Sequence, residues 1–197
     1  MALVRSILLA DGENLAIRYQ ALIASGRVPK ATNVHIQDVF VWQPDPNSLG
    51  SFIRTDILRI NYYTSVVGDD VRVEVVRDHI SKVKYYAHDD LYGGCQLHPH
   101  VFKKLKSSTK SRRVDINIAI DAMRHAYTDA VDVIYLMSGD GDFLHLVEEI
   151  ARSGKKVCVA AFSSGLETRL RSSVDHFTLL DDIFFEPASS HIASGDG

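Results

Sequence analysis

Apolar residues recur along this chain in two patterns, short continuous runs and helical stripes. Continuous apolar runs predict buried strands at Ser6–Ala10, Ile57–Ser65, Val133–Met137 and Val157–Phe162. Weaker runs predict further strands at Val39–Trp42, Lys82–His88 and Phe177–Leu180. Apolar stripes with the period of a helix predict helices at Leu15–Ile23, Asp69–Ile80, Val114–Tyr127 and Phe143–Ile150. The alternation of strand, turn and helix indicates an α/β protein with parallel strands.

Two of the strand-to-helix turns are acidic. Asp140 and Asp142 follow the run that ends at Met137, and Asp11 follows the run that ends at Ala10. In a parallel sheet these turns lie at the carboxyl ends of the strands, where ligands bind. The carboxylates are therefore expected at one edge of the sheet. The structural alternative is that Asp142 or Asp11 only caps a helix and Asp140 is a turn residue.

The predicted helix Val114–Tyr127 carries two more aspartates. Asp115 lies in its first turn, where the helix dipole favours a carboxylate. Asp121 is six residues further on and points in a different direction, so only Asp115 is expected to reach the acidic turns. Two sets of residues on this helix are predicted to face neighbouring elements. The first is an apolar stripe of Ile116, Ile120, Met123 and Tyr127. The second is a seam of small residues, Ala119, Ala122 and Ala126, that allows close approach to a sheet.

The charge of the chain is close to balanced, with a net value of −3, but one segment is strongly basic. The segment Phe102–Arg113 contains no acidic residue. Its basic residues are Lys103, Lys104, Lys106, Lys110, Arg112 and Arg113. Lysine and arginine neutralise phosphates whatever the base sequence, so the segment is interpreted as a contact surface for a nucleic-acid backbone. The alternative is a solvated loop.

Other features restrict the class of protein. No apolar run is as long as a membrane span, and the N-terminal residues resemble a first strand and not a signal peptide. The two cysteines do not suggest a disulfide framework, and Cys158 lies in an apolar run expected in the core. These features favour a cytoplasmic protein. Cys95, His98 and His100 are close in sequence but have no fourth ligand at the spacing of a zinc site.

The chemistry of the acidic residues favours a hard divalent cation. Carboxylates that crowd together repel one another unless protons or cations lie between them. Oxygen donors suit Mg²⁺ or Mn²⁺, and two such ions can assist displacement at a phosphodiester. Asn14, Ser138 and Asp121 are expected in supporting positions, and the candidate ligands and catalytic residues are Asp11, Asp115, Asp140 and Asp142.

Three segments together resemble a known family. They are Leu9–Leu15, Arg113–Asp121 and Met137–Phe143, and they are similar to the signature blocks of the NYN domain, which includes LabA-like proteins and belongs to the PIN-like nuclease superfamily. The resemblance implies a three-layer α/β/α sandwich with a mostly parallel sheet and a metal-dependent ribonuclease site. The resemblance covers roughly Leu3–Phe185, so one domain is expected over residues 1–186. Residues 187–197 are small and polar and are expected to form a disordered tail.

Three functions are weighed on these grounds. The first is a metal-dependent endoribonuclease that uses Mg²⁺ or Mn²⁺ on single-stranded or structured RNA. The second is a non-catalytic module that binds RNA or a protein partner on the same fold. The third, a phosphatase with Asp11 as nucleophile, is disfavoured because no second aspartate follows Asp11 by two residues. The helix face around Ala122 is a candidate surface for a homodimer.

Overall fold

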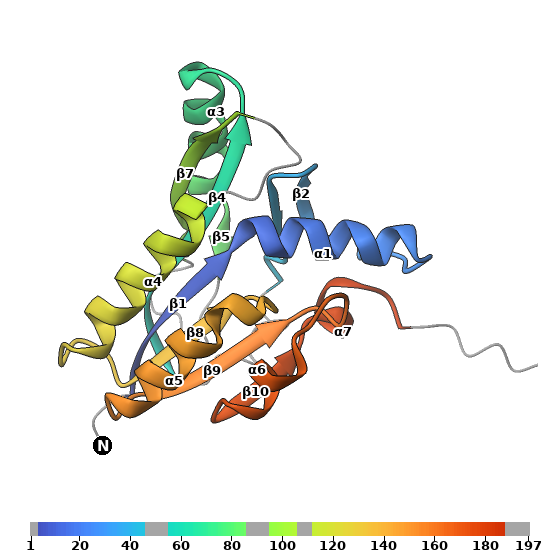
Figure 1. The fold of residues 1–197 in the computed structure, drawn as a ribbon. Helices are drawn as coiled ribbons and strands as arrows, with labels where there is room; N and C mark the ends of the chain where they lie inside the picture. Colours follow the sequence, from blue (N-terminus) through green and yellow to red (C-terminus); the bar gives the residue numbers. More distant parts are fainter. Residues whose placement is uncertain (1–3, 46–54, 86–94, 106–111, 188–197) are drawn as a thin grey trace, which may run out of the picture.

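Six parallel strands form the centre of the molecule (Figure 1). The computed structural model describes residues 4–45, 55–85, 95–105 and 112–187. The strands have the order β10-β9-β8-β1-β4-β7, and every neighbouring pair is parallel. Their bounds are β1 Arg5–Asp11, β4 Asp56–Val67, β7 His98–Lys104, β8 Val133–Met137, β9 Lys156–Ala161 and β10 His176–Leu179.

Helices cover both faces of this sheet, so the predicted three-layer α/β/α sandwich is confirmed (Figure 1). On one face lie α1 (Gly12–Ala24), α3 (Asp70–Ser81), α7 (Asp181–Phe184) and a small antiparallel pair, β2 (Val34–Ile36) with β3 (Phe40–Trp42). On the other face lie α4 (Arg112–Ala126), α5 (Leu144–Arg152) and α6 (Thr168–Ser172). A second short pair consists of β5 (Lys84–Tyr85) and β6 (Cys95–Gln96).

The central strands are apolar on both faces because both faces are covered. Leu8 and Leu9 of β1 are each fully buried, and they belong to the two different cores on opposite sides of the sheet. One core gathers large aromatic side chains such as Trp42 and Tyr62, whereas the other contains mostly aliphatic residues. Within the described ranges, every helix is too short or too polar to cross a bilayer.

The face that α4 turns to the sheet differs from the predicted one. Ile116, Ile120 and Tyr127 are 55%, 50% and 63% exposed. The residues buried on this helix recur every four positions and are Val114, Ile118, Ala122 and Ala126. The helix has two overlapping apolar stripes, and the one with small residues packs because it allows close approach to the strands. The prediction that small residues face the sheet is therefore confirmed for Ala122 and Ala126. Ala122 is 1% exposed, so it cannot be part of a homodimer surface.

Two local features differ from what the sequence pattern indicates. The first residues of the basic segment, Phe102–Lys104, are the end of strand β7, an element that the apolar pattern did not predict, so the alternative of a solvated loop does not hold for them. The short helix α6 is capped by Glu167, whose carboxylate accepts a hydrogen bond from the backbone N–H of Arg169 at 3.2 Å. The segment Ser164–Glu167 has the pattern of a capping box, which predicts Ser164 as the cap, but Ser164 precedes the helix by four residues. Residues 1–3, 46–54, 86–94, 106–111 and 188–197 lie outside the described residues, and with them all but the first residue of the predicted tail 187–197.

The buried thiol of Cys158 gives a simple test of the packing. Burial, with a smaller contribution from Asp175, raises the pKa of Cys158 to about 11. Alkylation requires the thiolate, and at pH 8 a thiol with that pKa is ionised to only about 1 part in 1,000. We expect native protein to resist iodoacetamide at Cys158 at pH 8 and to lose this protection in denaturant. Peptide mass spectrometry resolves the site, and rapid alkylation of native protein at Cys158 would contradict the packing.

Candidate functional site

Strands β1 and β8 bring two acidic turns together at the carboxyl edge of the sheet. Ala10 pairs with Met137 in parallel register, so both strands end at the same level. Ser138, directly after β8, donates a hydrogen bond from its hydroxyl to Asp11 Oδ2 at 3.0 Å. The turn after β1 and the turn after β8 are therefore joined directly by side chains, as the parallel arrangement predicts.

Asp11 is buried and fixed by several bonds. Its Oδ1 accepts the backbone N–H of Asn14 at 3.1 Å, so it caps α1, and its exposed fraction is 0%. Asn14 in turn accepts the backbone N–H of Gly139 at 3.2 Å through its side-chain oxygen. Asp11 therefore caps the helix that follows it, as the structural alternative expects. The same contacts also hold the turn after β8 in place, so capping and site assembly are not exclusive.

Gly12 is required by the close packing beneath this turn. A Cβ at this position would lie 2.2 Å from Cε1 of Tyr62 and 2.8 Å from the carbonyl oxygen of Tyr63. No side chain fits at those distances without displacing backbone of β4. The glycine after Asp11 therefore lets α1 start directly against the central strand.

Asp140 and Asp142 continue the hydrogen-bonded series outward. The backbone N–H of Asp140 donates to the Ser138 hydroxyl at 3.2 Å, and Asp140 Oδ1 accepts the backbone N–H of Asp142 at 3.0 Å. Asp140 is therefore the residue that caps the short 3₁₀ turn Gly141–Phe143, and not Asp142 as the structural alternative supposed. Asp142 is exposed and Asp140 half-buried. The series Asp11–Ser138–Asp140–Asp142 leads from the core to solvent.

The two aspartates of α4 occupy different places. The carboxyl edge of the sheet around Asp11, Asp140 and Asp142 is called the acidic edge below. Helix α4 connects the carboxyl end of β7 to the amino end of β8, so its first turn, with half-buried Asp115, starts at the level of the acidic edge. Asp121 lies six residues further, about 9 Å along the helix axis. It accepts a 2.6 Å hydrogen bond from the Tyr63 hydroxyl and pairs with Arg124. Burial and then the Asp121 carboxylate raise the pKa of Tyr63, so this hydroxyl stays a donor. Asp121 therefore supports Tyr63 and Arg124 and not the acidic turns.

The basic segment is divided between structural and exposed positions. Lys104 is largely buried and pairs with Glu13 at 2.8 Å, and Lys103 pairs with Asp70 at 3.0 Å. Arg112 and Arg113 are exposed in the first turn of α4, whereas Lys106 and Lys110 lie outside the described residues. Glu13 has no signal in the sequence pattern; its side chain is 1% exposed and also accepts a hydrogen bond from the Ser65 hydroxyl.

The donor chemistry of the acidic edge suits a hard cation, but the described side chains do not by themselves form a cation cage. Among the residues that the structure describes, no group of three or more histidine, cysteine or acidic side chains is placed to hold a metal. Mg²⁺ is commonly bound through one or two carboxylates together with waters and substrate phosphates. A site of that open kind is compatible with the carboxylates at this edge.

A second group of polar residues was not predicted as a site. It lies on the sheet face beside α4 and consists of Arg59, Asn61, His98, His100, Asp121, Arg124 and His125. The available signal was the alternation of His98 with His100 and of Arg59 with Asn61, which places each pair on one face of its strand. For His98 and His100 the signal is weak, because the sequence of β7 has no continuous apolar run that predicts a strand.

Comparisons with known proteins agree with this architecture. A crystal structure of a protein of unknown function from Vibrio parahaemolyticus superposes with a TM-score of 0.58 and 22% sequence identity, over 93% of this chain and 97% of that chain. An uncharacterized protein of Methanocaldococcus jannaschii is 25% identical over 139 residues, which are 71% of this chain; the chain spans about half (53%) of that relative. The family model of the NYN domain matches residues 5–181. The chain therefore belongs to the NYN domain family, with the fold of the PIN-like nucleases.

Proposed function

We propose that the protein is a divalent-metal-dependent endoribonuclease whose reaction takes place at the carboxyl edge of β1 and β8. The observation that carries the proposal is the hydrogen-bonded series Asp11–Ser138–Asp140–Asp142 in a chain of a family whose members are generally nucleases. The proposed metal-binding and catalytic residues are Asp11, Asp115, Asp140 and Asp142. The proposed cation is Mg²⁺ or Mn²⁺, in keeping with the oxygen donors of this site.

The protein residues have separate tasks in this proposal. Asp11 is held by Asn14 and Ser138 and fixes the spacing of the two turns. Asp140 and Asp142 present negative charge at the boundary with solvent. Exposed Arg112 and Arg113, at the N-terminal end of α4, attract the phosphates of an RNA strand toward that edge. A divalent cation, when bound there, supplies positive charge that stabilises a phosphodiester during displacement.

Cleavage of a circular RNA by purified protein tests the proposal. We expect the circle to be opened in the presence of Mg²⁺ or Mn²⁺, because an endonuclease needs no free end, and to stay intact with EDTA. Addition of excess Mn²⁺ after EDTA should restore cleavage. Opening of the circle at an unchanged rate in EDTA would contradict metal dependence, and cleavage of linear RNA alone would contradict the endonucleolytic mode.

A non-catalytic module that binds RNA is the second candidate. One observation favours it, namely that the described residues include no preformed group of three metal-binding side chains. The same preparation distinguishes the two candidates. Saturable RNA binding with an intact circle at every metal concentration would support the binding module and reject the nuclease.

A further inference from the structure

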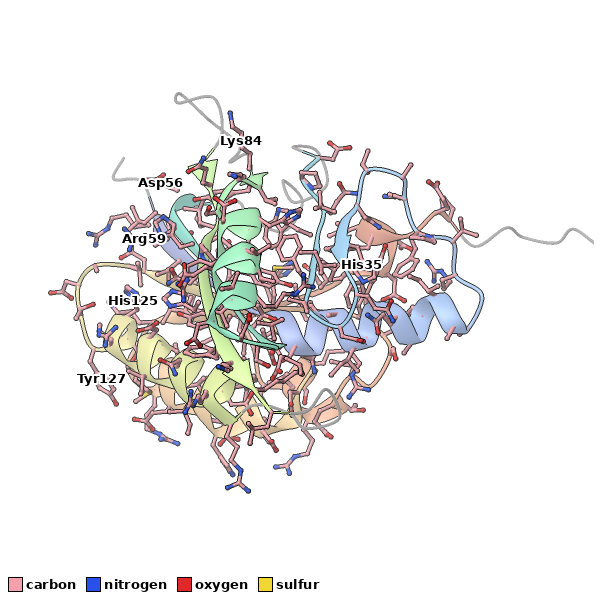
Figure 2. The ribbon with its side chains drawn as sticks, turned by 90° about the horizontal axis from the view of Figure 1, so that it is seen from above. His35, Asp56, Arg59, Lys84, His125 and Tyr127 are labelled. Carbon is pink, nitrogen blue, oxygen red and sulfur yellow. The ribbon has the colours of Figure 1, made fainter. Side chains whose placement is uncertain are left out.

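Two adjoining cavities open on the face of the sheet that carries α4. The larger one, about 370 Å³, is polar and is lined by Arg59, Asn61, His98, His100, Asp121, Arg124 and His125. The smaller one, about 220 Å³, is lined by Ile7, Leu58, Arg59 and His125 and is mainly apolar. Arg59 and His125 belong to both cavities and lie on the same side of the molecule (Figure 2). Together the cavities reach the volume typical of small-ligand pockets.

Strand register explains why these residues gather. Asn61 pairs with His98 and Tyr63 with His100 across β4 and β7, so their side chains form two neighbouring rows. The ring of His100 stacks on that of Tyr63 with 4.5 Å between centroids. Helix α4 contributes Arg124 and His125 from its last turn. The walls of the polar cavity are therefore built on rigid elements and not on loops.

The charges in the polar cavity favour an anion. The carboxylate of Asp121 already has two partners, since it accepts a hydrogen bond from the Tyr63 hydroxyl and pairs with Arg124. Arg59 is exposed and, within the described part of the chain, makes no ion pair or hydrogen bond through its guanidinium group. Burial is the main cause that lowers the pKa of His98, His100 and His125. The Asp121 carboxylate acts in the opposite direction at His100 and His125, and repulsion by the charge of Arg59 lowers the pKa of all three histidines. A bound anion would relieve that repulsion.

The polar cavity starts at the level of the acidic edge. Tyr63, beside the polar cavity, pairs in register with Asp11. Arg59 is four residues earlier on the same strand, which corresponds to about 13 Å. The cavities thus begin at the level of the acidic edge and extend down one face of the sheet, along α4.

We propose that these two cavities form a nucleotide subsite for an RNA strand. A phosphate of the strand is bound by the guanidinium of Arg59 with the imidazoles of His98 and His125, and the attached base lies against Ile7 and Leu58. Arginine is suited to this task because its planar group donates several hydrogen bonds to phosphate oxygens. The proposal rests on the proposed function for the identity of RNA, but the binding of a nucleotide does not require cleavage.

Titration of the histidine ring protons by NMR tests the subsite. The protein carries Asp140→Asn so that RNA stays intact, and the probes are inorganic phosphate, uridine 5′-monophosphate, and a tetranucleotide with and without a 5′-phosphate. We expect saturable shifts of His98, His100 and His125 with uridine 5′-monophosphate, weaker shifts with phosphate alone, and binding of the tetranucleotide. If the 5′-phosphorylated tetranucleotide binds more tightly, the phosphate in the polar cavity is the 5′-terminal one. If both tetranucleotides bind equally, the bound phosphate is an internal one.

Two variants make the test specific. Arg59→Ala should weaken binding of uridine 5′-monophosphate about 10- to 100-fold, the usual effect of removing a hydrogen bond to a charged group. Lys156→Ala removes another exposed positive charge, on β9 and away from the cavities, and should leave the affinity unchanged. Unchanged affinity in Arg59→Ala, or shifts confined to residues outside the cavities, would overturn the subsite. Nucleotide binding without any RNA cleavage by the unsubstituted protein would instead reject the nuclease proposal alone.

Discussion

Replacement of Asp140 by asparagine is expected to slow RNA cleavage at least ~100-fold, which corresponds to about 3 kcal/mol of lost transition-state stabilisation. The fold should be retained, because the oxygen of an asparagine side chain can accept the same hydrogen bond from the Asp142 backbone N–H. The substitution therefore removes charge at the proposed cation site with little change in shape. Initial rates on the circular RNA, measured over a range of Mn²⁺ concentrations, provide the comparison.

A matched control is available at the opposite edge of the sheet. Asp175 accepts the backbone N–H of Val157 at 2.8 Å near the start of β9, so Asp175→Asn also retains a hydrogen bond and loses one charge. We expect that variant to cleave at the unsubstituted rate. Thermal melts of both variants check that each is folded. Full activity of folded Asp140→Asn would refute the assignment of the acidic edge as the active site.

The acidic edge was predictable in part because its geometry follows from strand order. Buried parallel strands leave a strong apolar signal, and residues that follow two such strands lie at one edge whatever the rest of the fold does. The contact of Asp11 with Ser138 was therefore accessible from the sequence once β1 and β8 were taken as neighbours. The place of Asp115 depends on how α4 docks, and its proximity to the edge follows only from the topology of β7, α4 and β8.

The docking of α4 shows why helix faces are harder to predict. Ile116 and Ile118 are both apolar, but only Ile118 is buried. The choice between their two stripes depends on the shape of the sheet surface, which accepts Ala122 and Ala126 at close range. Hydrophobicity alone favours the larger side chains, whereas close packing against strands favours the smaller ones. The shape of the sheet surface cannot be derived from the apolar pattern of α4, so that pattern does not predict which stripe is buried.

The roles of charged residues on the edge strand are hard to predict for a related reason. Strand β7 is at the edge of the sheet, and its sequence, His-Pro-His-Val-Phe-Lys-Lys, has neither a long apolar run nor a regular alternation, so it resembles a basic loop when taken alone. The basic pattern accordingly predicts Lys104 as an RNA contact, whereas in the structure Lys104 pairs with Glu13, 91 residues away in the sequence. A contact at that separation has no local signature. It depends on β7 and α1 meeting at β4.

Lys104→Met is expected to destabilise the fold by about 3 kcal/mol, at the lower end of the usual 3–5 kcal/mol for loss of one partner from a buried ion pair. The side chain of Glu13 is 1% exposed and that of Lys104 10% exposed, so water cannot replace the lost ammonium group effectively. Glu13 keeps its hydrogen bond from Ser65, which limits the penalty. Urea denaturation followed by circular dichroism gives the free energy of unfolding.

Two comparisons separate this structural role of Lys104 from a role in RNA binding. Lys103→Met removes the neighbouring positive charge, but its ion pair with Asp70 is exposed and should contribute only about 0–1 kcal/mol. The double variant Glu13→Gln with Lys104→Met removes both buried charges and should recover much of the lost stability, since Gln can still accept the Ser65 hydroxyl. If the double variant is stable and binds RNA as the unsubstituted protein does, Lys104 acts through Glu13. If Lys104→Met retains full stability and loses RNA affinity, the lysine contacts phosphate instead.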